Sequence, residues 1–140
     1  MPASVLVQSR TTGTPGRYIL SGEGKHMVVD ASPASGGAGE GFVAQELFVG
    51  ALATCAQAIV HAKGAELSIA PTSVLVEVRS ERDADAIPPA YSCVRMDFSF
   101  AGVSESEAKL LVAEFTRVCP IYHTIAAATE MMVSVRVIAD

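Results

Sequence analysis

A long apolar segment from Gln45 to Lys63 constrains the fold of this chain more than any other feature. It contains strong helix formers and no proline, and Gly64 follows it where a helix would end with a left-handed cap. Almost no polar stripe runs along it, and a helix that is apolar all round is buried on every side. The sequence therefore predicts a buried central helix, which in so short a chain indicates the interface of a dimer.

Composition supports the need for a partner. The chain has 140 residues, enough for one domain with a single core, and we expect one domain over 1–140. Hydrophobic residues make up 50% of it and charged residues only 18%, so apolar surface remains to be covered by a second copy. The net charge of −5 has the wrong sign for binding a phosphate backbone, which excludes nucleic acid as a partner.

The N-terminal residues, the length of the apolar stretches and the number of cysteines limit where this protein is found and what chemistry it performs. Residues 1–4 carry no basic region that leads into an apolar run, so we expect no secretory signal and a cytoplasmic protein. No stretch reaches the 18 or so purely apolar residues of a membrane span, so we expect no membrane partner. Three widely spaced cysteines fit neither a disulfide scaffold nor a zinc motif, and they favour thiol chemistry without a metal or cofactor.

The remaining segments predict an α+β fold. Turn signals separate short extended segments at 4–9, 17–21 and 25–30, typical of a small antiparallel meander, and a Gly-rich loop at 31–41 follows. Alternating apolar residues predict strands at 72–80, 91–100 and 132–138. Ser104 and Glu107 form a capping box for a helix that ends near Val118, and Pro120 begins a shorter helix that runs to about Ala128.

Cys119 stands at the junction of those two helices. As the N-cap of the second helix it would receive backbone N–H groups and the helix dipole, which lower the pKa of a thiol. The alternative is an inert cysteine buried in the core. Cys55, in the middle of the long helix, and Cys93, in a strand, both suit the second interpretation when each is taken alone.

His123 follows Cys119 by four residues, so the two side chains share a helix face. Such a pair indicates a base-activated thiol, half of a metal site, or a histidine that only forms a structural hydrogen bond. A zinc site would need two further ligands, for which Cys55 and His61 are the candidates.

Glu46 opens the long helix, where a carboxylate favours the positive end of the helix dipole. Nine positions separate it from Cys55, about 13.5 Å along a helix and half a turn out of phase. A chemical role for Glu46 therefore requires a bend before the helix or the site of a partner chain.

Two segments, 45–55 (QELFVGALATC) and 118–125 (VCPIYHTI), resemble the OsmC/Ohr family of osmotically inducible and organic hydroperoxide resistance proteins. The resemblance covers nearly the whole chain. It rests on an apolar helix that begins with Glu-Leu and leads to Ala-x-Cys, followed later by Cys-Pro-Ile.

The resemblance implies an OsmC-like α+β fold, with antiparallel sheets around a long buried central helix in an intertwined homodimer. It also implies a peroxidase in which Cys55 attacks an organic hydroperoxide and Cys119 resolves the sulfenic acid as a disulfide. An external dithiol then reduces that disulfide. By the same resemblance, we expect Phe48, Leu52 and His123 to line an apolar substrate pocket.

Two positions depart from the peroxidase members that the chain resembles. Gln45 stands where those members carry a glutamate, and Glu46 instead matches the Glu-Leu of the broader OsmC-like subgroup. Thr14 falls where their activating arginine belongs, so Arg17 and Arg10 become the candidates for a cation that stabilises the Cys55 thiolate.

Two function classes follow from this sequence. The first is a cysteine-based hydroperoxide reductase in oxidative stress defence, with Cys55, Cys119, Glu46 and Arg17 as the catalytic residues. The second is an OsmC-like dimer that binds an apolar small molecule or senses redox state without efficient turnover. Burial of both thiols without a nearby cation would favour the second class.

Overall fold

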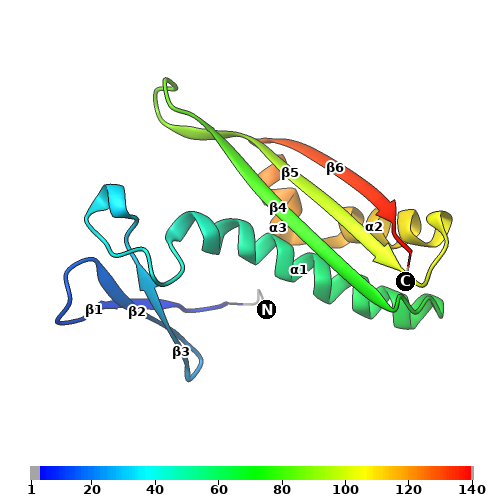
Figure 1. Cartoon of the computed structure of the whole chain (residues 1–140), viewed down its shortest axis with the longest axis horizontal. Coiled ribbons are helices and arrows are strands. Elements are labelled where there is room, and N and C mark those ends of the chain that lie inside the picture. The colour runs from blue at the N-terminus through cyan, green and yellow to red at the C-terminus, as the bar shows by residue number, and fades with distance from the viewer. Residues whose placement is uncertain (1–3, 140) are drawn as a thin grey trace. The chain divides into compact units, whose positions relative to one another are not determined.

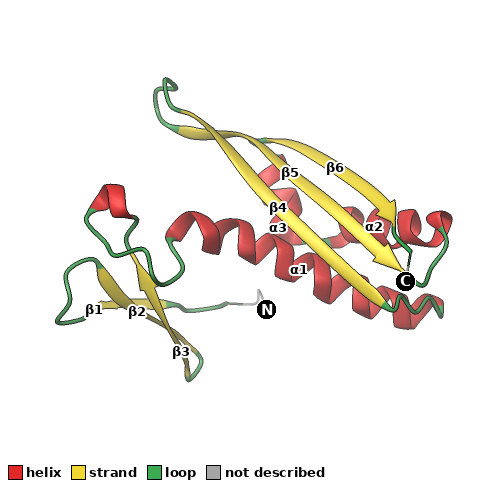
Figure 2. Ribbon diagram, in the orientation of Figure 1, coloured by secondary structure: helices red, strands yellow, loops and turns green. Residues whose placement is uncertain are grey.

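The computed structural model describes residues 4–139 and divides into two units, Met1–Phe48 and Val49–Asp140. Each unit is described by itself below. The helix α1, Ala44–Leu67, begins in the first unit and continues through the second. Figures 1 and 2 show the helices and strands of the two units.

The N-terminal unit holds the predicted antiparallel meander. Its strands are β1 (Gln8–Thr11), β2 (Arg17–Gly22) and β3 (Lys25–Asp30), in the order β1-β2-β3. Glu23 and Gly24 both have positive φ in the two-residue turn between β2 and β3, the conformation that matches the twist of a hairpin. The first strand begins at Gln8, four residues later than predicted, and the loop that follows β3 contains one short 3₁₀ turn, Pro33–Ser35.

The end of α1 differs from the prediction. The helix continues past Gly64 to Leu67, and Ser68 takes the left-handed conformation with φ of 57°. The Ile69 N–H then donates to the Gly64 carbonyl at 2.9 Å, which closes a Schellman-type cap. Gly64 is needed for a different reason, because a Cβ at this position would lie 2.7 Å from the Ile69 carbonyl oxygen.

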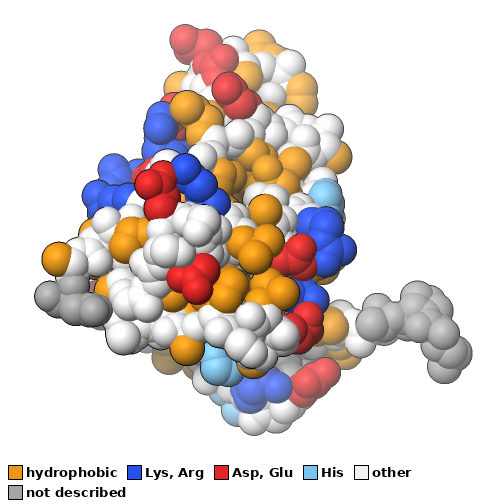
Figure 3. Space-filling view, turned by 90° about the vertical axis from the view of Figure 1, so that its right-hand side faces the viewer, with side chains coloured by type: hydrophobic (Ala, Val, Ile, Leu, Met, Phe, Trp, Pro, Cys, Tyr) orange, Lys and Arg blue, Asp and Glu red, His pale blue; other side chains and the backbone are white. Residues whose placement is uncertain are grey.

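A single chain buries only one face of α1. The buried residues are spaced by four, which places them in one row along the helix: Leu52, Ala56, Val60 and Gly64. Other positions of α1, such as Ala51, Thr54 and Ala58, are exposed in one chain, so the predicted burial on every side requires the second copy that the sequence also predicts. On the face of the molecule drawn in Figure 3, hydrophobic side chains are exposed between charged ones.

Strand β5 is the centre of the C-terminal sheet. The strands are β4 (Ser73–Asp83), β5 (Ala90–Ala101) and β6 (Glu130–Val137), in the order β4-β5-β6. β4 pairs with β5 in antiparallel register, whereas β5 and β6 are parallel. The prediction of antiparallel sheets is thus wrong for this last pair, because the intervening helices form the long crossover that parallel strands require.

The two crossover helices match the sequence closely. α2, Glu105–Val118, has the predicted capping box, in which Ser104 and Glu107 each satisfy a backbone N–H of the other. α3, Pro120–Ala126, begins at the predicted proline and ends two residues earlier than predicted. Phe98 of β5 and Phe115 of α2 are fully buried, with ring centroids 5.6 Å apart, so α2 packs on the sheet through its apolar face.

By length and composition alone, α1 could cross a bilayer, a test that the core helix of a soluble protein also passes.

Candidate functional site

Two thiols from distant parts of the chain meet in the C-terminal unit. The Cys55 Sγ and the Cys119 Sγ lie 3.0 Å apart, although 64 positions separate the two residues. Both are free thiols, since a disulfide bond would be close to 2.05 Å long. The pair therefore stands about one ångström short of a covalent bond.

The two thiols differ in their access to solvent. Cys55 is half-buried in the middle of α1, whereas the side chain of Cys119 has no exposed surface. A small molecule from solvent can therefore reach Cys55 while Cys119 stays covered.

Local sequence fixes the place of Cys119. Pro120 disfavours helical geometry in the residue before it, so Cys119 has extended dihedral angles, φ −73° and ψ 115°. It ends α2 and caps α3, and its Sγ accepts the Tyr122 N–H at 3.4 Å. This confirms the predicted N-cap position of Cys119.

The electrostatics of the pair disfavour an anion on Cys55. Burial raises the pKa of the Cys55 thiol, and the contact with Cys119 raises it further. At neutral pH Cys55 is therefore a thiol rather than a thiolate. A peroxidase built on this residue needs a further group that removes the proton or stabilises the thiolate.

Cys93, the third cysteine, is not part of the thiol pair. It is buried in β5, where its cross-strand partners are Glu81 and Glu130. This buried position inside the sheet suits the structural role that the sequence predicts.

His123 makes two contacts beside the thiol pair. Its Nε2 lies 3.0 Å from the Arg117 carbonyl oxygen, and its ring meets the ring of Tyr122 at right angles with centroids 5.8 Å apart. Tyr122 in turn packs edge-on against Phe115. These contacts give His123 the structural hydrogen bond that the sequence left open among three alternatives.

The other predicted site residues on α1 have separate environments. Leu52 is fully buried one turn before Cys55, and Phe48 is half-buried at the end of the N-terminal unit. The carboxylate of Glu46 accepts the Val43 N–H at 2.9 Å, so it caps the first turn of α1. This is the helix-end role that the sequence indicates for Glu46.

Arg17 is held inside the N-terminal unit. Its guanidinium binds the Asp30 carboxylate through two hydrogen bonds of 2.8 and 2.9 Å and reaches Glu40 at 2.8 Å. Asp30 also accepts the backbone N–H groups of Glu40 and Gly41, so it ties β3 to the loop before α1. The hydrogen bonds from Arg17 and these amides hold the pKa of Asp30 well below its usual range.

Sequence reasoning missed Asp30 and Tyr122. Asp30 ends a predicted strand beside a glycine-rich loop, and a carboxylate there is a signal for capture of loop amides. Tyr122 carries no chemical signal, because its contribution is a backbone N–H to Cys119 and a ring between Phe115 and His123.

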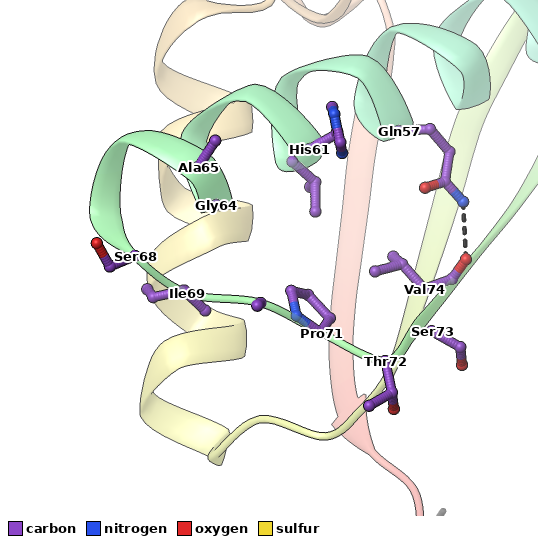
Figure 4. Close-up of a pocket in the computed structure, with 12 residues that line it drawn as sticks. Gln57, His61, Gly64, Ala65, Ser68, Ile69, Pro71, Thr72, Ser73 and Val74 are labelled. Atoms are coloured by element: carbon purple, nitrogen blue, oxygen red, sulfur yellow. Dashed lines mark hydrogen bonds between the residues drawn. The ribbon is translucent and has the colours of Figure 1, made fainter.

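A cavity of about 550 Å³ lies along the second half of α1, away from the thiols (Figure 4). Its floor is the segment 68–74, and Gln57 spans one side by donating to the Val74 carbonyl at 2.9 Å. His61 also lines it, whereas neither Cys55 nor Cys119 does. Across residues 4–139, no three Cys, His, Asp or Glu side chains gather as ligands for a metal ion.

Known proteins share this fold and the placement of its elements. The model of the OsmC-like protein family matches residues 37–134. No curated protein sequence matches the chain.

Solved structures match over almost the full length of both chains. An OsmC-like protein from Mycoplasma pneumoniae has a TM-score of 0.85 at 14% identity, over 99% of each chain. An organic hydroperoxide resistance protein OsmC from Legionella pneumophila has a TM-score of 0.75 at 18% identity, over 95% of this chain and 96% of its own. An organic hydroperoxide resistance protein from Elizabethkingia anophelis has a TM-score of 0.76 at 16% identity, over 96% of each. The α+β architecture and the family match agree, and this chain belongs to the OsmC-like protein family.

Proposed function

We propose that this protein reduces organic hydroperoxides through a redox cycle of Cys55 and Cys119. The observation that carries the proposal is the 3.0 Å contact between the two sulfur atoms, made by free thiols from separate helices. Relatives of this fold are named organic hydroperoxide resistance proteins, which agrees with the proposal.

The chemistry balances with one external reductant. The Cys55 thiolate attacks the terminal oxygen of the hydroperoxide, so that the S–O bond forms, the O–O bond breaks and the alkoxide leaves as an alcohol after taking a proton. Cys119 then attacks the sulfur of the Cys55 sulfenic acid, which forms the disulfide and releases water. An external dithiol returns both cysteines to thiols and is itself oxidised.

The difference in exposure supports this order of roles. Cys55 is the accessible thiol and Cys119 the buried one, so the substrate meets Cys55 first. A resolving thiol already in contact captures the sulfenic acid before a second peroxide molecule can oxidise it further.

Activation of Cys55 is the demanding step, because burial raises its pKa. For this step we propose Arg17 and Glu46 of the partner copy, as a cation that favours the thiolate and a carboxylate that orients it, because within one chain Glu46 caps the same helix nine positions before Cys55. Phe48, Leu52 and His123 complete the proposal as the apolar and aromatic groups that select an organic hydroperoxide over hydrogen peroxide.

The working form in this proposal is a cytoplasmic homodimer. The single chain leaves one side of α1 uncovered, and large apolar side chains such as Leu6, Phe42 and Leu75 are exposed. A second copy would cover this apolar surface.

The test starts from fully reduced protein treated with cumene hydroperoxide or tert-butyl hydroperoxide. Free thiols are titrated, and the intact mass and the disulfide-linked peptides are measured. Wild type is compared with Cys55→Ser, Cys119→Ser and, as the matched control, Cys93→Ala.

The proposal predicts a distinct result for each variant. Wild type and Cys93→Ala should lose two thiols as a Cys55–Cys119 disulfide, Cys55→Ser should stay reduced, and Cys119→Ser should accumulate a sulfenic or sulfinic acid on Cys55. Persistence of all thiols under excess hydroperoxide would reject the proposal.

A second function is favoured by the raised pKa of Cys55, since a thiol that stays protonated reacts slowly with peroxides. In that case the dimer binds an apolar small molecule or senses redox state, and the thiol pair closes only with strong oxidants. Disulfide formation with diamide, together with inertness to hydroperoxides, would identify this function.

A further inference from the structure

We propose that His123 is a positioning residue that holds the α2–α3 junction closed and thereby fixes Cys119 against Cys55. It touches neither sulfur in this role. The inference rests on the thiol pair of the proposed function, but it requires only that the two sulfurs react with each other and makes no use of a peroxide.

At the junction, the Arg117 carbonyl needs a hydrogen-bond donor from outside α2, and His123 provides it. The last four carbonyls of a helix have no partner within it, and Arg117 is the second-to-last residue of α2. Helix α2 cannot continue to supply partners, because Pro120 diverts the chain at Cys119. The imidazole of His123 reaches back six residues to the Arg117 carbonyl, at 3.0 Å.

The direction of this bond is determined by its chemistry. A carbonyl oxygen only accepts, so the Nε2 of His123 must carry a hydrogen and donate. Both the neutral ring protonated on Nε2 and the imidazolium meet this requirement.

His123 forms hydrogen bonds to the junction through its backbone as well as its ring. Its N–H donates to the Cys119 carbonyl at 3.1 Å, while its ring holds Arg117 on the other side of the same cysteine. The Cys119 N–H meanwhile donates to Phe115 at 3.0 Å. Residues on both sides of Cys119 are therefore tied to a single histidine.

The ring is itself held in place. Tyr122 meets it at an interplanar angle of 83°, and the same tyrosine packs edge-on against Phe115, which is fully buried in the core. The rings of Tyr122, Phe115 and Phe98 thus link the imidazole to β5. This explains how an exposed histidine can keep one orientation without burial.

By holding the junction closed, His123 raises the effective concentration of the Cys119 thiol at the Cys55 thiol. Holding two reacting groups at contact distance favours bond formation between them without any change in their intrinsic reactivity. Loss of the His123 ring contact would let Cys119 sample positions away from Cys55, so the disulfide would become less stable relative to the two thiols.

The experiment measures the dithiol–disulfide equilibrium of the full chain in buffers of reduced and oxidised dithiothreitol, in a Cys93→Ala background. We expect His123→Leu to lower the equilibrium constant for the Cys55–Cys119 disulfide roughly two- to tenfold, the range of one ordinary hydrogen bond. His123→Gln keeps an N–H donor and should recover most of the wild-type value. His61→Leu removes an exposed histidine from α1 and is the matched control.

A second measurement does not depend on a disulfide. In a Cys55→Ser, Cys93→Ala background only Cys119 can be alkylated, and its rate reports how often the junction opens. His123→Leu should raise this rate by a similar factor, and His123→Gln should not.

Unchanged values of both quantities in His123→Leu would overturn the inference. Equal losses in the Leu and Gln variants would also overturn it, because they would point to general packing rather than to the donated hydrogen bond. If wild type forms no disulfide in these buffers, the proposed function fails, while the alkylation rates still decide the role of His123.

Discussion

At the scale of single residues, Cys55 combines a position that substrates can reach with a pKa that opposes its ionisation. We expect its alkylation rate to rise about tenfold for each pH unit between 7 and 9, since only the thiolate reacts. Replacing Cys119 by Ala removes one cause of the raised pKa and should move the half-maximal rate to lower pH. The measurement is iodoacetamide labelling followed by mass spectrometry, with Cys93→Ala as the background. A wild-type rate that is already flat above pH 7 would contradict this prediction and would indicate a cation beside Cys55.

The ion pair of Arg17 and Asp30 leads to a prediction about acid stability. The low pKa of the folded Asp30 stabilises the protein above the unfolded pKa of about 3.9, and this contribution is lost as the pH falls below that value. Arg17→Gln should lower the midpoint of thermal unfolding at pH 6 and weaken its dependence on pH between 4 and 2. Circular dichroism measures both, with Arg17→Lys as the variant that keeps the charge but loses the paired geometry.

The same variants separate a structural arginine from a chemical one. If Arg17→Gln unfolds like wild type at pH 6 but reacts slowly with hydroperoxides, its role lies in activating Cys55. The sequence suggested only this chemical role for Arg17. No local pattern predicts that its guanidinium binds Asp30, thirteen positions later in the chain.

At the scale of elements, two substitutions at the end of α1 should change the free energy of unfolding in opposite directions. Gly64→Ala would place a methyl group against the Ile69 carbonyl and should destabilise the protein by about 1–3 kcal/mol. Ser68→Gly relieves a positive φ and should stabilise it by up to about 1 kcal/mol. Urea unfolding of both variants checks the two signs. Tolerance of Gly64→Ala would contradict this prediction and would show that the Ile69 carbonyl can move away from an added methyl group.

Local patterns predicted most elements because each depends on neighbouring residues. The capping box at Ser104, the proline that begins α3 and the alternation in β5 all appear where the sequence indicates them. The parallel pairing of β5 with β6 could not be predicted in this way, since either direction satisfies the same alternation. The contact of Cys55 with Cys119 came from family resemblance, because no local pattern relates residues on two separate helices.

At the scale of the whole molecule, the uncovered side of α1 predicts a dimer. Light scattering should give twice the 14.5 kDa mass of one chain. Ala58→Glu adds a charge to an exposed position on α1, so it should leave the fold of one chain intact and weaken the dimer. Circular dichroism separates loss of assembly from loss of folding.

Ala113→Glu is the control for this prediction, because Ala113 is an exposed alanine on α2, whose neighbours include the ion pair of Glu114 with Arg117. It should leave the mass unchanged. A stable, well-folded wild-type monomer would contradict the prediction and would leave the apolar side of α1 in need of a different partner.

The parallel pairing of β5 and β6 also sets the order in which the protein can acquire its chemistry. Cys119 lies in the crossover between these strands, and both crossover helices contact β6, so the crossover is complete only once β6 has been synthesised and has joined the sheet. On a ribosome, Cys55 would emerge long before its partner could be positioned. A nascent chain therefore carries Cys55 without its redox partner until the second half of the chain has been synthesised.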